Sequence, residues 1–60
     1  MTERKADIIA VRPPGETVSY SCCMIEAELK TAGLKAEKIV KGITQPDGSQ
    51  EFWVYLQSLA

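Results

Sequence analysis

The chain has 60 residues, of which 45% are hydrophobic and 25% charged, with seven Lys and Arg against eight Asp and Glu. So short a chain allows one domain, near the lower size at which a single core stabilises a fold without help. The net charge of −1 lacks the basic excess that drives general nucleic-acid binding. The sequence has no transmembrane-length apolar run and no signal-peptide pattern. We therefore expect one cytoplasmic domain over residues 1–60, without membrane contact.

Cys22 and Cys23 are the only cysteines, and histidine is absent. Neighbouring side chains on a helix point about 100° apart, so these two thiols cannot form a disulfide with each other without distorting the backbone. Zinc sites, Cys/His nucleophiles and haem attachment need ligands that the chain lacks. We predict reduced thiols, no metal and no cofactor, with an intermolecular disulfide through the more exposed thiol as the alternative.

The N-terminal part predicts a short strand followed by a turn. Residues 1–5 are polar and expected to be frayed, and residues 7–11 form a β-branched run. That run ends at Arg12-Pro13-Pro14-Gly15, which neither a strand nor a helix can cross.

A helix is predicted next, from Thr17 or Ser19 as the N-cap to about Ala32. Gly33 suits the left-handed position just past a helix, and Leu34 can fold back as in a Schellman motif. At about 100° per residue, one apolar stripe faces the sheet and a shorter one lies opposite. The first stripe is Val18, Cys22, Ile25, Leu29 and Ala32, and the second is Tyr20, Cys23, Met24 and Ala27.

Two further strands are predicted over residues 37–44 and 50–57, around the turn Gln45-Pro46-Asp47-Gly48-Ser49. This turn suits a type I turn with a G1 bulge, which pairs Gln45 with Ser49. Extending that register places four pairs opposite each other: Val40 and Val54, Gly42 and Phe52, Ile39 and Tyr55, and Lys41 and Trp53. One face then carries Val40, Gly42, Phe52, Val54 and Leu56, and the other carries Ile39, Lys41, Ile43, Glu51, Trp53 and Tyr55. A slip of one residue would exchange the faces of a strand.

Lys38 and Lys41 mark the second strand as an edge, whereas the apolar run from Phe52 to Leu56 suits the centre of a sheet. We therefore predict a small α+β domain of order β-α-β-β. Its three-stranded antiparallel sheet has the order 1-3-2, and one helix covers the face of Phe52.

One helix cannot cover both faces of a sheet, so the face of Trp53 and Tyr55 should remain available to a partner. Aromatic side chains are frequent anchors in protein interfaces. We predict a non-enzymatic interaction module, either a homodimer or a regulator or inhibitor of a larger protein, of the kind found among bacterial accessory and phage proteins. The predicted binding residues on the sheet are Ile39, Lys41, Ile43, Trp53 and Tyr55. The second choice is the helix stripe of Tyr20, Cys23, Met24 and Ala27.

Single-stranded nucleic-acid binding is the alternative prediction, with Trp53 and Tyr55 stacking on bases while Lys38 and Lys41 contact phosphates. The predicted Lys41 and Trp53 neighbours also fit a plain cation–π pair. Glu51 on the same face and the negative net charge favour a protein partner.

Enzymatic activity is not expected, because the acidic residues form no catalytic motif. Glu26 and Glu28, for example, are about 200° apart on the predicted helix. A domain of this size also has little room for a pocket that excludes water.

Overall fold

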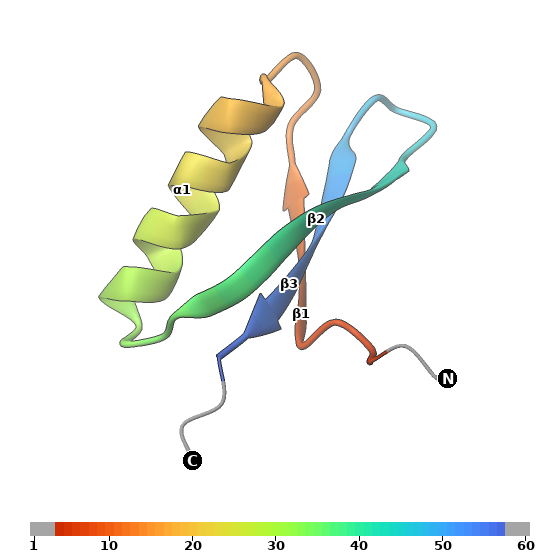
Figure 1. Ribbon diagram of the computed structural model, residues 1–60. Helices are drawn as coiled ribbons and strands as arrows, with labels where there is room; N and C mark the ends of the chain where they lie inside the picture. Colours follow the sequence, from red (N-terminus) through yellow and green to blue (C-terminus); the bar gives the residue numbers. More distant parts are fainter. Residues whose placement is uncertain (1–3, 58–60) are drawn as a thin grey trace.

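The computed structural model describes residues 4–57 and contains β1 (Ile8–Arg12), α1 (Val18–Thr31), β2 (Ala36–Thr44) and β3 (Gln50–Leu56). The strands form one antiparallel sheet in the order β1-β3-β2. The helix lies along one side of this sheet, and β2 is long and curved (Figure 1). The predicted α+β fold, element order and strand order are confirmed. Within the described residues no helix could span a membrane, since α1 has 14 residues and a span needs about 20.

Both ends of α1 form as their capping residues predict. The Thr17 side chain accepts a hydrogen bond of 3.1 Å from the backbone N–H of Tyr20. At the other end Gly33 has φ of +78°, and its N–H donates to the Lys30 carbonyl at 3.0 Å. The N–H of Leu34 donates to the Leu29 carbonyl at 2.8 Å. These two bonds define a Schellman motif, because they satisfy carbonyls that the helix itself leaves without partners.

The core lies between α1 and the sheet. Ile25 and Leu29 of the helix and Phe52 and Val54 of β3 form one cluster, each at most 7% exposed. This confirms that the face of Phe52 and Val54 is the one the helix covers.

The predicted inner stripe of the helix is only partly correct. Val18 is 47% exposed, whereas Ser21 is 1% exposed. The Ser21 hydroxyl donates to Glu16 Oε1 at 2.9 Å, and Glu16 in turn accepts two hydrogen bonds from the Arg12 guanidinium at 2.9 and 3.0 Å. This chain of polar contacts ties the end of β1 to the first turn of α1. The helix is rotated so that a hydrogen-bonded serine, rather than Val18, faces inward.

The hairpin turn forms as predicted, but the strand register beyond it differs from the predicted one. The Gln45 N–H donates to the Ser49 carbonyl at 2.7 Å, Gly48 has φ of +94°, and Thr44 is opposite Gln50. Between Thr44 and Lys41, however, β2 contains one residue more than β3. This bulge moves every later pair of the predicted register by one residue.

The predicted pairs of Ile39, Val40, Lys41 and Gly42 are therefore wrong. Three of these residues pair as follows: Lys41 with Phe52, Val40 with Trp53 and Ile39 with Val54. A slip of one residue exchanges the faces of a strand. Ile39 and Lys41 consequently belong to the helix side of the sheet, and Val40 to the opposite side. A second irregularity, between Ala36 and Lys38, shifts the last pair to Ala36 with Leu56.

The bulge has identifiable hydrogen-bond partners. The side-chain amide of Gln50 donates to the carbonyl of Gly42 at 2.9 Å and to that of Ile43 at 3.3 Å. The Thr44 hydroxyl donates to the Gln50 side-chain carbonyl at 2.7 Å. The Gln50 side chain thus hydrogen-bonds backbone carbonyls of β2 that the bulge leaves without partners in the regular ladder.

Candidate functional site

The sheet face turned away from α1, here called the open face, is the main candidate surface. It carries Ile9 and Val11 of β1, Lys38 and Val40 of β2, and Glu51, Trp53 and Tyr55 of β3. Ile9 and Val11 are 59% and 55% exposed, and Val40 is 38% exposed. In the described part of the chain α1 is the only helix, and it packs on the other face. A contiguous apolar area with an aromatic residue at its centre is typical of a binding surface.

Trp53 lies across β2 in a fixed position. A Cβ atom at Gly42 would lie 2.7 Å from Cε2 and 2.8 Å from Cδ1 of the indole, so the ring rests on bare backbone at that glycine. The indole Nε1 points toward Glu51, with 3.4 Å to Oε1. The ring is half-buried and remains accessible to a partner.

Tyr55 is on the open face as predicted, but other side chains cover it. The residue is 9% exposed. The Arg4 guanidinium and the Lys38 ammonium lie 5.3 and 4.8 Å from its centroid. Such cation–π contacts hold the two long side chains over the ring. Tyr55 therefore supports the open face and offers little surface of its own.

Arg4 belongs to the segment expected to be frayed, of which residues 1–3 lie outside the described residues. Its guanidinium donates to the Leu56 carbonyl at 3.1 Å and pairs with Asp7 at 3.1 Å and Glu37 at 3.5 Å. Asp7 also accepts a hydrogen bond of 2.8 Å from the Leu56 N–H. The segment before β1 is thus attached to the end of β3.

The two ends of the open face carry charges of opposite sign. Lys38 lies beside Tyr55, and Glu51 lies opposite Val11 at the other end of β3. Glu51 accepts a hydrogen bond from the Gln45 side chain at 2.6 Å. Among the described residues, ion pairs join Arg4 to Asp7, Arg4 to Glu37 and Arg12 to Glu16, and neither Lys38 nor Glu51 belongs to one.

The five residues predicted to form the binding surface of the sheet therefore lie in different places. Trp53 and Tyr55 lie on the open face, Ile39 packs against the core, and Lys41 is opposite Phe52 on the helix side. Ile43 lies within the bulge and is 60% exposed.

Three residues of the open face were missed by the sequence reasoning. Val40 was missed because of the bulge. Ile9 and Val11 were missed because the hairpin register covers β2 and β3 alone, whereas these two residues of β1 pair with Trp53 and Glu51. The alternation of the segment Ile8-Ile9-Ala10-Val11 around the central strand was the available signal.

The helix stripe is a separate and smaller surface on the outer side of α1. Tyr20 is 53% exposed, Cys23 and Ala27 are exposed, and Met24 is half-buried. Cys22 is half-buried and packs against the core, which leaves Cys23 as the more accessible thiol.

Two shallow hollows flank Trp53 and Tyr55, and Arg4 lines both of them. Residues 4–57 contain no group of three Cys, Asp or Glu side chains placed to hold a metal ion. Hydrogen bonds from Arg12 lower the pKa of Glu16, and hydrogen bonds from Ser49 lower the pKa of Asp47. No family model, curated protein or solved structure matches the chain.

Proposed function

We propose that this chain is a small protein-interaction module that binds a partner through the open face. The supporting observation is a row of Ile9, Trp53 and Val40, which lie directly opposite one another on the three strands. The helix covers the other face of the sheet. A partner would remove this row from water.

The exposed apolar area is large enough to contribute to binding. Ile9, Val11 and Val40 are between 38% and 59% exposed. Complete burial of such a side chain stabilises by about 1.5–3 kcal/mol, so covering the remaining part contributes about 1 kcal/mol for each residue. Trp53 adds a rigid aromatic anchor, because its ring already rests on Gly42 and loses little conformational entropy on binding.

Nucleic-acid binding has less support from the same geometry. The ring of Tyr55 is covered by Arg4 and Lys38 and offers no free face for stacking. Lys41 lies on the helix side, whereas the negative Glu51 lies beside Trp53. Emission of Trp53 should therefore be unchanged by a single-stranded oligonucleotide at low salt, and strong salt-dependent quenching would favour the nucleic-acid alternative.

Site-specific photo-crosslinking in the producing cells tests the proposal. A photoreactive amino acid at Ile9, on the open face, is compared with one at Tyr20, which is similarly exposed on the helix stripe. We expect a discrete crosslinked protein, either a second copy or another chain, from position 9. The substitution Trp53→Lys should abolish that product, and Met24→Lys should leave it unchanged. Products from position 20 alone would instead identify the helix stripe as the interface.

A further inference from the structure

The side chains of the open face form three rows across the strands. The middle row is the apolar one, Ile9, Trp53 and Val40. One outer row contains Tyr55 and the positive Lys38, and the other contains Val11 and the negative Glu51. Along β3 the rows are two residues apart, so each outer row lies about 7 Å from the middle row. The face is therefore apolar at its centre and oppositely charged at equal distances on either side.

We propose that the occupant of the open face is a second copy of this chain, packed face to face about a two-fold axis that runs across the strands over Trp53. This inference rests on the function proposed for the open face. A rotation about such an axis reverses the direction of every strand and leaves each strand over its own copy. The middle row then meets the same row of the partner, and the row of Lys38 meets the row of Glu51.

The distances suit ion pairs across this interface. Packed sheets lie about 10 Å apart, and neighbouring strands are about 4.8 Å apart within a sheet. After the rotation Lys38 on β2 faces the partner row that contains Glu51 on β3, with a lateral offset of one strand. A lysine side chain can bridge that separation, and each two-fold interface would contain the pair twice.

The charges also select this axis over the other face-to-face arrangement. A two-fold axis parallel to the strands would place Lys38 over the row of Lys38, and Glu51 over the row of Glu51. Like charges placed together oppose association. The other charged groups at this end balance one another and leave the charge of Lys38 in excess. Arg4 pairs with both Asp7 and Glu37, and Lys5, which lines the hollow beside Tyr55 together with Arg4, supplies the second positive charge.

Charge reversal tests the arrangement. We expect the native chain to dimerise in sedimentation equilibrium, and Lys38→Glu or Glu51→Lys alone to weaken the dimer by about tenfold or more, since each creates two like-charged contacts. An equimolar mixture of the two variants should associate again, because every contact in the mixed dimer is then between opposite charges. The double variant should also dimerise.

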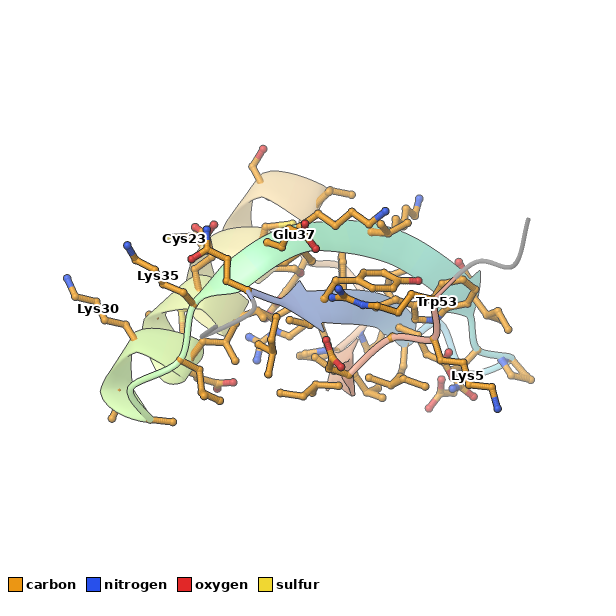
Figure 2. All side chains as sticks on the ribbon, turned by 60° about the horizontal axis from the view of Figure 1, so that its bottom comes forward. Lys5, Cys23, Lys30, Lys35, Glu37 and Trp53 are labelled. Atoms are coloured by element: carbon orange, nitrogen blue, oxygen red, sulfur yellow. The ribbon has the colours of Figure 1, made fainter. Side chains whose placement is uncertain are left out.

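Lys35→Glu is the matched control. It changes the net charge by the same amount as Lys38→Glu, and Lys35 lies at the far end of the molecule from Trp53, near Lys30 at the end of α1 (Figure 2). Far-UV circular dichroism of each variant verifies folding. Recovery of the dimer on mixing excludes misfolding as the cause of a loss.

The outcomes separate this inference from the function on which it rests. A native monomer whose position 9 crosslinks to a different protein overturns the second copy as occupant and leaves the interaction module standing. A dimer that loses affinity with Trp53→Lys but not with either charge reversal overturns the proposed axis. A monomer with no crosslink from position 9 overturns both.

Discussion

Gly42 is the position where a single methyl group tests the packing of Trp53. In the substitution Gly42→Ala the new Cβ would meet the indole at 2.7 and 2.8 Å, whereas ordinary van der Waals contacts begin at 3.4 Å. The ring must therefore move away from β2. Overpacking of this kind costs about 1–3 kcal/mol. Replacing a strand glycine by alanine otherwise stabilises by about 0.5–1 kcal/mol, so we expect a net loss of about 1 kcal/mol.

A loss of about 1 kcal/mol is measurable, because domains of this size have a free energy of unfolding of only about 3–9 kcal/mol. The melting temperature should fall by about 4–8 °C. Urea unfolding followed by circular dichroism gives the change directly, and emission of Trp53 should shift to longer wavelength as the ring becomes more hydrated.

The matched control places Gly42→Ala in a Trp53→Leu background. Without the indole the alanine has no clash, and the same change should stabilise by about 0.5–1 kcal/mol. The difference between the two backgrounds is the coupling between the two sites, which we expect to be about 1–3 kcal/mol. Equal effects in both backgrounds would refute the contact between Gly42 and the ring as the cause.

Three further predictions concern the loop after β1, the C-terminal cap of α1 and the two cysteines of α1. Hydrogen bonds from Arg12 lower the pKa of Glu16, so the stability that this carboxylate contributes is present above its usual pKa and is lost as the pH falls through the lowered value. Melting temperatures from pH 2 to 7 should therefore fall less steeply on the acid side for Glu16→Gln than for the native chain. Gly33→Ala should destabilise by about 1 kcal/mol in urea unfolding, because Gly33 has φ of +78°. In the native chain Cys23 should react quickly with a thiol reagent, while Cys22 should react only after unfolding, as mass spectrometry of the labelled peptides would show.

The sequence predicted those parts of the fold that depend on local chemistry. Thr17, Gly33 and the turn from Gln45 to Ser49 each specify a backbone conformation within a few residues, and each forms as expected. The strand order followed from hydrophobicity and charge, which are also visible in the sequence. These features need no knowledge of distant contacts.

The register and the helix rotation depended on contacts across the chain. The bulge is stabilised by Gln50 and by the indole lying over Gly42, and neither contact can be derived from local propensity. A glycine inside a strand often marks a bulge or a close approach, so Gly42 carried the available signal. Ser21 likewise faces inward because Glu16 accepts its hydrogen bond. A hydrophobicity scale assigns serine to the surface and therefore does not predict a buried, hydrogen-bonded Ser21.

The proposed face-to-face dimer depends on the bulge in β2. In the register without a bulge, Lys41 would lie beside Trp53 in the middle row, and a two-fold axis over that row would place two lysines together. The extra residue moves Lys41 to the helix side and brings Val40 into the row instead. A charge at the axis is thereby replaced by an apolar side chain, and the same shift places Lys38 opposite Tyr55, at the end of the open face away from Glu51. In the proposed dimer, the extra residue of β2 between Lys41 and Thr44 is therefore what allows the open face to pack on its own copy.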